Sequence, residues 1–332
     1  MTATARPVPA GSGPGPDVLT LGETLVSFQG EPGQMVTTRT LSKSIAGAET
    51  NVAIGLSRSG LRVAAVTRVG DDPFGAEVLR TLRAEAVDTR GVTVDPRRPT
   101  ALMVKERPTA VTANVWYYRA GSAAAALSPD DVDRALAALG TPRHVHLTGI
   151  TLALGDGPRA AVTHLLSRAR AAGCSVSFDA NHRKRLWDAE AFVAACRPVA
   201  EQGDDLLCSD EEAALLTGCP EPAQALDVLA GWGPRRVVVR LGADGSIGSA
   251  AGGPVVAAPA VAAGPVVDVV GAGDAHTTGY LAEVLAGGDL ATALATGSWA
   301  AGHVVAGVGD WENLPHPPAW SDRRSGRRSV DR

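Results

Sequence analysis

The sequence predicts an α/β fold with a central, mostly parallel β-sheet flanked by helices, and with a small β-sheet lid. Over the second half of the chain, short apolar segments alternate with helical patterns, which is typical of a parallel sheet covered by helices on both faces. Two earlier segments, residues 23–45 and 99–120, have extended patterns interrupted by turn residues, which predicts strands of a separate sheet. The 332 residues, of which 45% are hydrophobic, can bury a sizeable core.

The elements follow one another in a regular order. Residues 1–16 are rich in proline and glycine and predict a flexible tail, so the folded domain is expected over residues 17–315. The main strands are predicted, in chain order, at residues 17–22, 144–147, 175–179, 205–208 and 236–240. Residues 316–332 contain an arginine cluster and predict a disordered C-terminal tail. Ligands of such a sheet bind beyond the carboxyl ends of its strands.

Composition excludes several classes of protein. The net charge of −4 provides no basic field for nucleic acid. We find neither an apolar run long enough to cross a membrane nor the charged-then-apolar order of a signal peptide, so a cytoplasmic protein is expected. The sequence contains neither a Cys-x-x-Cys nor a His-x-x-x-His spacing, so these residues predict no metal site. We therefore expect reduced thiols at all four cysteines, which are Cys174, Cys196, Cys208 and Cys219.

The segment over residues 268–274 reads Asp-Val-Val-Gly-Ala-Gly-Asp and leads into a helical pattern. The helix should begin near Gly271, Ala272 or Gly273, and its first amides have no partner within the helix. Together with the helix dipole they form an anion site, which fits a phosphoryl group. Asp274 would then lie beside that group and act as the base for an acceptor hydroxyl. On local sequence alone, an ordinary turn before a helix is the alternative.

This segment resembles the C-terminal signature of the ribokinase-like (PfkB) carbohydrate kinases, Asp-Thr-x-Gly-Ala-Gly-Asp followed by a helix of small residues. Val269 replaces the usual threonine, His276 stands where an aromatic residue is common, and Thr278 is bulkier than the usual residue. Residues 46–53, Ala-Gly-Ala-Glu-Thr-Asn-Val-Ala, and residues 69–75 resemble the family's N-terminal signature, although Ala46 replaces one glycine of its Gly-Gly pair. The resemblance covers residues 17 to about 309 and implies a ribokinase-like fold.

The resemblance also implies roles for individual residues. Asp274 would be the base and the amides of residues 271–273 the anion hole, while Gly47 and Asn51 would contact the sugar. Residues 240–245, Arg-Leu-Gly-Ala-Asp-Gly, resemble a loop that lies along ATP, and Ser209 stands where the family has the asparagine of an Asn-x-x-Glu motif that orders magnesium. The expected cofactor-binding residues are Asn181, Ser209, Arg240, Gly242, Ala243 and Gly245, and Glu212 is expected to hold Mg²⁺ through water. A helix start with an acidic first turn is the alternative reading of residues 209–212.

The acceptor is predicted from residues 116–123 and 179–183. The first segment, Trp-Tyr-Tyr-Arg-Ala-Gly-Ser-Ala, resembles the 2-keto-3-deoxygluconate kinase branch, in which a tyrosine and an arginine reach the substrate. Tyr117 and Arg119 inherit those roles, and Arg183 supplies a second arginine. Guanidinium groups bind carboxylates through paired hydrogen bonds, so two arginines favour an acidic sugar. Read locally, Tyr117 would pack within the lid and Arg119 would be a solvated strand residue.

The expected function is therefore transfer of the γ-phosphate of ATP to a terminal hydroxyl of a sugar acid, with 2-keto-3-deoxygluconate as the expected acceptor. The cofactors would be ATP and Mg²⁺, with a monovalent cation as a further candidate. The partner would be a small sugar molecule, and the edges of the lid sheet would pair two subunits into a homodimer. One alternative is a PfkB-type kinase for another ketose or a nucleoside. Another is a non-catalytic sugar-sensing protein that kept the pocket.

Overall fold

The large sheet confirms the predicted α/β class. The computed structural model describes residues 15–31, 33–109 and 112–325. Nine strands form the large sheet in the order β13-β12-β11-β10-β9-β8-β1-β4-β5. Neighbouring strands are parallel except for β11 with β12 and β12 with β13, which are antiparallel. The strands of this sheet are β1 (Val18–Leu21), β4 (Val63–Gly70), β5 (Val92–Asp95), β8 (His144–Thr148), β9 (Ser175–Asp179), β10 (Asp205–Ser209), β11 (Arg236–Arg240), β12 (Ser246–Ala250) and β13 (Val256–Ala258).

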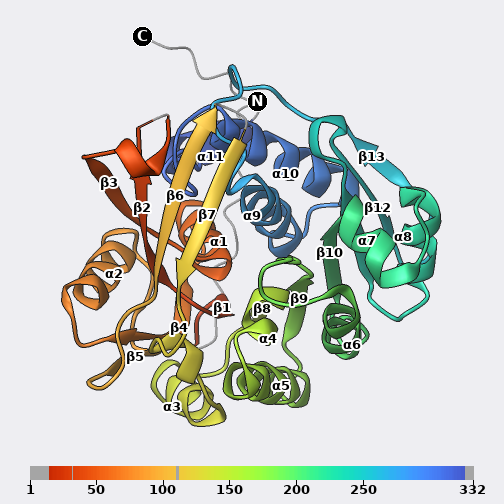
Figure 1. Cartoon of the computed structure of the whole chain (residues 1–332). Coiled ribbons are helices and arrows are strands. Elements are labelled where there is room, and N and C mark those ends of the chain that lie inside the picture. Colours follow the sequence, from red (N-terminus) through yellow and green to blue (C-terminus); the bar gives the residue numbers. More distant parts are fainter. Residues whose placement is uncertain (1–14, 32, 110–111, 326–332) are drawn as a thin grey trace.

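Helices cover both faces of this sheet (Figure 1). They are α1 (Ala48–Arg58), α2 (Pro73–Ala84), α3 (Pro129–Leu139), α4 (Gly149–Ala153), α5 (Asp156–Ala171), α6 (Ala189–Ala200), α7 (Asp210–Thr217), α8 (Pro222–Ala230), α9 (Ala272–Leu285), α10 (Leu290–Val305) and α11 (Pro317–Ser325), with short 3₁₀ turns at Met35–Thr37, Ala124–Ala126 and Gly242–Asp244. Consecutive strand residues belong to opposite cores: Leu206 packs with α6 and α8, whereas Leu207 packs with the core that contains α1, α9 and α10. This alternation follows from the pleat, in which successive side chains point to opposite faces.

The lid is a separate four-stranded sheet in the order β3-β2-β6-β7. Its strands are β2 (Leu25–Gly30), β3 (Leu41–Ala46), β6 (Leu102–Thr109) and β7 (Thr112–Tyr118). The strands fall in the two segments predicted to form the lid, residues 23–45 and 99–120, except that β3 extends one residue further, to Ala46. Because β2 directly follows β1, and β3 directly precedes α1, the lid is joined to the main sheet at the edge where ligands are expected.

The two predicted tails differ from the structure at their inner ends. Residues 1–14 and 326–332 lie outside the described residues, but residues 15 and 16 are buried. The prediction of disorder from residue 316 onwards is wrong for α11. Trp320 is 1% exposed, and its ring packs edge-to-face on Trp299 at 5.1 Å. Arg323 lies over the Trp299 ring, so part of the arginine cluster covers aromatic surface through its side chains.

Two further observations concern cysteines and membranes. The four cysteines form no disulfide, and Cys174, Cys196 and Cys208 are buried. Among the described helices, none combines the length and the apolar character that crossing a bilayer requires.

Candidate active site

The turn before α9 has the geometry that the sequence predicts. α9 begins at Ala272, and Gly271 caps it with φ 83°, a left-handed conformation that glycine adopts without strain. The Ala272 amide donates to the Val269 carbonyl at 3.4 Å, whereas the amides that follow in the first turn have no helical carbonyl to accept them and point out of the helix start. A Cβ atom on Gly271 would lie 2.1 Å from the carbonyl oxygen of Asp310. Both the backbone angle and the lack of space therefore require glycine here.

Gly271→Ala should lower the free energy of unfolding by roughly 2–5 kcal/mol, the sum of a left-handed alanine and an overpacked contact. Gly287 is a matched control, because it has the same φ of 83° and no heavy atom within 4 Å of an added Cβ. Gly287→Ala should cost only about 1–2 kcal/mol. Urea unfolding of both variants measures the difference. Equal losses would show that the contact with Asp310 contributes nothing.

Asp274 lies in the first turn of α9 and is 8% exposed. Burial raises the pKa of its carboxyl group to about 7, against the opposing effects of a hydrogen bond from Asn51 and the charge of Arg183. Asn51 Nδ2 donates to Oδ2 at 2.7 Å, and Asn181 Nδ2 approaches Oδ1 at 3.4 Å. Residues of α1, of the segment after β9 and of α9 therefore meet at one carboxylate. A carboxyl group whose pKa lies near neutrality can exchange a proton with an alcohol at physiological pH.

The N-terminal signature positions Asn51. Gly47 caps α1 with φ 152°, and a Cβ on it would lie 2.3 Å from the carbonyl oxygen of Glu23 in the lid connection. The amide of Asn51 donates to the Gly47 carbonyl at 2.7 Å. The sequence assigned Asn51 to the sugar, whereas its Nδ2 here contacts Asp274, and its Oδ1 is buried without a hydrogen-bond partner. That oxygen is an acceptor available to a ligand hydroxyl.

The local reading of the lid strand is correct for Tyr117, which packs against the lid core, and wrong for Arg119. Arg119 is not solvated: its guanidinium stacks on the Tyr117 ring at 3.8 Å, and its Nη1 lies 3.3 Å from Glu23 Oε2. Glu23 is 3% exposed, and burial raises the pKa of its carboxyl group. Arg183, by contrast, is exposed and forms no ion pair with any residue that the structure describes. Of the two predicted arginines, only Arg183 has an uncompensated charge.

Arg240 is directed inward rather than along an open loop. Its guanidinium binds both carboxylate oxygens of Asp179, at 2.5 and 2.7 Å, and donates to Thr277 Oγ1 at 3.0 Å. It thereby ties the ends of β9 and β11 to α9. Gly242 and Ala243, further along the predicted ATP loop, are exposed, whereas Gly245 is buried with φ 95°. Asp179 and Thr277 were not predicted as site residues from the sequence, because their contacts with Arg240 join segments far apart in the chain.

Ser209 and Glu212 form a capping box at the start of α7. Ser209 Oγ accepts from the amide of Glu212 at 3.1 Å, and Glu212 Oε2 accepts from the amide of Ser209 at 2.7 Å. Glu212 Oε1 also accepts from the amide of His182 at 2.6 Å. The alternative prediction for residues 209–212, a helix start with an acidic first turn, is thus correct. A metal contact through water would use the lone pairs of the Glu212 carboxylate that these hydrogen bonds leave free. The described residues contain no group of three or more potential metal ligands.

His276 does not face Asp274. It is 4% exposed, its Nε2 lies 3.0 Å from Ser246 Oγ on β12, and its ring fills the space beside Gly297 of α10. Burial lowers the pKa of this imidazole to about 3, so it is neutral at physiological pH. The helical period places residues 274 and 276 on different sides of α9, which explains why proximity in sequence misleads here.

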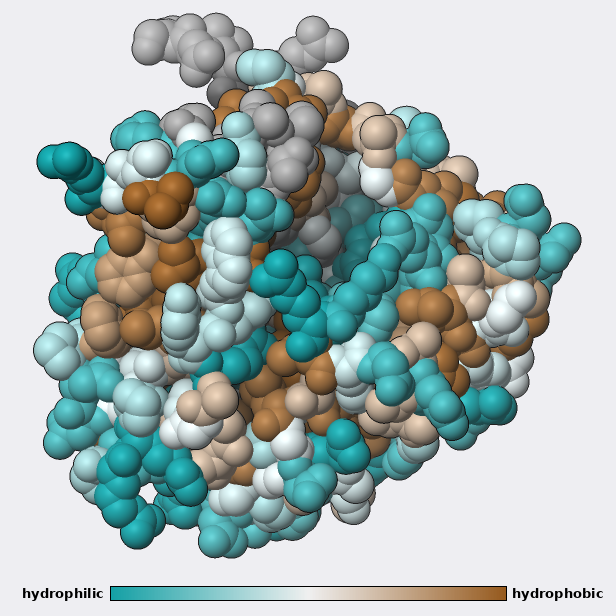
Figure 2. Space-filling model, viewed as in Figure 1, coloured by the Kyte–Doolittle hydropathy of each residue, from teal (hydrophilic) through white to brown (hydrophobic). Residues whose placement is uncertain are grey.

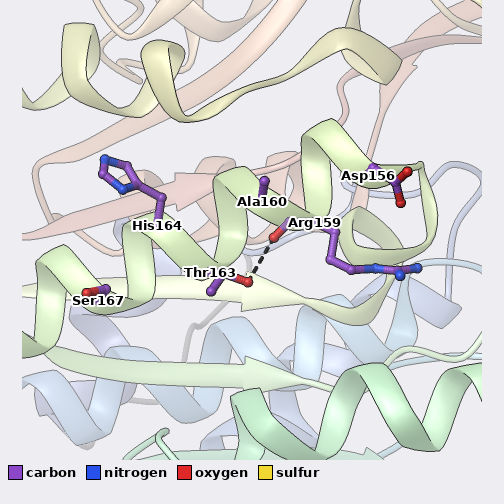
Figure 3. A pocket seen from close by; sticks show the side chains of 6 residues that line it. All are labelled: Asp156, Arg159, Ala160, Thr163, His164 and Ser167. Atoms are coloured by element: carbon purple, nitrogen blue, oxygen red, sulfur yellow. Dashed lines mark hydrogen bonds between the residues drawn. The ribbon is translucent and has the colours of Figure 1, made fainter.

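Figure 2 shows a hollow with hydrophilic side chains along its rim between the lid and the main body, on the side where α9 begins in Figure 1. Another hollow lies along α5 and is shown in Figure 3. All six residues that line it come from this single helix, and none belongs to either signature. The hollow along α5 is therefore a surface feature of one helix.

The fold and site together define an α/β protein with a lid, a helix start suited to an anion and a buried carboxylate of near-neutral pKa, an arrangement suited to transfer of a phosphoryl group to an alcohol. Residues 16–317 match the model of the pfkB family carbohydrate kinases. The chain belongs to this family and is a sugar kinase.

Relatives agree with this assignment. The 2-dehydro-3-deoxygluconokinase of Thermoproteus tenax is 35% identical over 305 residues, covering 90% of this chain and 91% of that protein. The enzyme of the same name from Bacillus subtilis is 32% identical, covering 95% of this chain and 97% of its own. A PfkB protein from Polaromonas sp. JS666 has a crystal structure with a TM-score of 0.82 and 34% identity, covering 92% of this chain and 99% of that one.

A structure titled as a ribokinase II from E. coli in complex with ATP and Mg²⁺ has a TM-score of 0.83 at 24% identity, covering 92% of this chain and 97% of that chain. At that level of identity the likeness shows the shared fold.

Proposed function

We propose that the protein transfers the γ-phosphate of ATP to the terminal hydroxyl of a sugar acid in the cytoplasm, with 2-keto-3-deoxygluconate (2-dehydro-3-deoxygluconate) as the acceptor. The observation that carries the proposal is the position of Asp274: a buried carboxylate with a pKa of about 7 in the first turn of a helix, where the dipole and the helix start suit an anion. A base and an anion site at one helix start are the two parts that phosphoryl transfer to an alcohol needs.

In the proposed step, Asp274 accepts the proton of the acceptor hydroxyl as its oxygen attacks the γ-phosphorus. The new O–P bond forms while the bond from the γ-phosphorus to the bridging oxygen breaks, and ADP leaves with that electron pair. The amides of residues 271–273 would stabilise charge on the transferring group. Asn51, through its free Oδ1, would hold a sugar hydroxyl.

Magnesium would neutralise charge on the phosphates when bound. Protein sites for Mg²⁺ commonly supply one or two carboxylates, with the remaining ligands coming from phosphates and water. Glu212 fits such a site as a partner of bound water, because two amides orient its carboxylate and leave further lone pairs free. This fit supports ATP and Mg²⁺ as the cofactors.

The acceptor is proposed from charge. Arg183 has no ion-pair partner among the described residues, and its charge is close enough to Asp274 to lower the pKa of that carboxyl group. The guanidinium of Arg183 could therefore neutralise the carboxylate of an acceptor bound beside it. The names of the relatives from T. tenax and B. subtilis support the same acceptor. The Arg119–Glu23 pair favours the alternative of a neutral ketose or nucleoside, because it already neutralises one of the two arginines.

The test is ADP release by the purified protein with Mg-ATP and each of 2-keto-3-deoxygluconate, 2-keto-3-deoxygalactonate, fructose, ribose and adenosine. Turnover confined to the two keto-deoxy acids is expected. Turnover on a neutral alcohol alone would overturn the sugar-acid assignment and retain the kinase. Sugar binding without ADP release by any compound would favour the non-catalytic sensor.

The lid would also mediate a homodimer. Apolar side chains are exposed on it at Leu41, Trp116 and Tyr118, which are 41%, 38% and 65% exposed. Burying such side chains against a second copy would remove them from water. Light scattering should give twice the chain mass of 33.9 kDa, and Trp116→Glu with Tyr118→Glu should give the single mass. A wild-type protein that elutes as a monomer at micromolar concentration would overturn the dimer.

A further inference from the structure

Lys105 carries a buried charge that neither signature explains. It lies on lid strand β6 and is 0% exposed, although lysine is almost never fully buried unless it is paired. Its Nζ donates to Asp268 Oδ2 at 2.7 Å and to Asp310 Oδ1 at 3.2 Å. Both carboxylates are largely buried: the side chain of Asp268 is 3% exposed and that of Asp310 is 11% exposed. One ammonium group therefore joins the lid to two segments that are distant in sequence.

Both carboxylates belong to segments that touch the phosphate-binding turn. Asp268 Oδ1 accepts the amide of Val270 at 3.1 Å, which shapes the turn immediately before Gly271. The backbone of Asp310 packs against the other side of Gly271, so closely that no Cβ would fit between them. Lys105 therefore holds the turn from two sides at the point where α9 begins.

The segment around Asp310 is fixed independently of Lys105. Trp311 Nε1 donates to the carbonyl of Ile45 on β3 at 2.8 Å, and Arg58 Nη1 donates to the carbonyl of Leu314 at 2.8 Å. The carboxylate of Asp268 has no ion-pair partner other than Lys105 among the described residues. Loss of the ammonium would therefore free the turn on the Asp268 side, while the Asp310 side kept its other contacts.

We infer that Lys105 is a positioning residue: from the lid, its ammonium provides the cation that holds the 268–271 turn in the shape in which the first amides of α9 can bind the transferring phosphoryl group. The inference rests on the proposed function. It also assigns a cationic group of the chain itself to the Asp268 and Asp310 carboxylates, so no free cation is needed between them. Two unpaired carboxylates at this position would repel an incoming polyphosphate.

The test compares Lys105→Ala with the wild type in Na⁺, K⁺, NH₄⁺, methylammonium and tetramethylammonium chloride at constant ionic strength. Lys105→Ala in Na⁺ should have a kcat about 100-fold lower, the effect of a small displacement of a catalytic group, while the KM for the sugar stays within about threefold. NH₄⁺ or methylammonium should restore kcat at least about tenfold by entering the space between the two carboxylates, and tetramethylammonium, which has no N–H, should not. Wild-type kcat should be the same in all five salts.

A second variant separates positioning from folding. The double variant Lys105→Met with Asp268→Asn removes the ammonium together with the carboxylate of Asp268, so no unpaired charge is left at residue 268. It should therefore recover much of the stability that Lys105→Ala loses. Its kcat should nevertheless stay low, because nothing joins the turn to the lid. A kcat within about threefold of wild type in either variant would overturn the inference, as would a loss in Lys105→Ala that no amine restores. A wild-type protein without turnover would instead count against the proposed function.

Discussion

Asp274→Asn is expected to lower kcat by about 1,000-fold, because an amide cannot accept the hydroxyl proton and general-base catalysis contributes about 10²–10⁴. The variant should still bind sugar and nucleotide, since Asn51 and the helix amides remain in place. Steady-state ADP release measures kcat. Asp289→Asn is the matched control, because Asp289 is also a carboxylate at a helix start but is exposed and lies at α10. A residual kcat within about tenfold of wild type would exclude Asp274 as the base.

The pKa of Asp274 also predicts how activity depends on pH. As a base, Asp274 must be ionised, so kcat/KM should rise about tenfold per pH unit below pH 7 and level off above it. The acid limb should move to higher pH in Arg183→Met, because the charge of Arg183 lowers the pKa of Asp274. An acid limb near pH 4 in the wild type would mean that the titrating group is not this carboxyl.

Stability should show the opposite dependence on pH. Because the pKa of Asp274 is raised in the folded protein, its contribution to stability is present below its ordinary pKa of 3.8 and is lost as pH rises through about 7. Asp274→Asn should therefore be more stable than wild type at pH 8, by roughly 1–2 kcal/mol, and not at pH 4. The gain is limited because Asn51 and Asn181 both donate to the carboxylate, and the new amide offers only one acceptor oxygen. Urea unfolding at the two pH values measures it.

Arg183→Met should lower kcat/KM for 2-keto-3-deoxygluconate by about 10–150-fold, the range for a lost hydrogen bond to a charged group. With a neutral alcohol, kcat/KM should change by less than about threefold, because no carboxylate is present to be bound. The assays belong at pH 8.5, where Asp274 is ionised in both proteins and its altered pKa has no effect.

Arg183 is the preferred arginine for this experiment. Arg119→Met would leave Glu23 buried without its partner and would destabilise the lid by itself. Lys184→Met is the matched control, since Lys184 is the next residue and is exposed, with only an exposed partner in Glu211. Equal losses for acidic and neutral acceptors in Arg183→Met would show that Arg183 does not recognise the carboxylate.

Much of the fold follows from local patterns in the sequence. Alternating apolar segments and helices predict a parallel sheet, because this pattern buries both faces of each strand. The predicted helix start near residues 271–273 and the lid at residues 23–45 and 99–120 also follow from local patterns, since glycine, proline and strand periods act over a few residues. The arginine cluster near residue 324 led to a wrong prediction of disorder over α11, because charge composition does not reveal that Trp320 packs on Trp299.

The sequence by itself determined the family of this protein, the helix start proposed to bind an anion, and Asp274 as the candidate base, because these depend on residues that are neighbours in the chain. Only the tertiary structure decided which groups surround them. It turned Asn51 toward Asp274, paired Arg119 with Glu23 and Arg240 with Asp179, and placed Lys105 against Asp268 across 163 residues. A buried charge must find its partner wherever the fold brings one, and the spacing of residues along a chain does not encode that position.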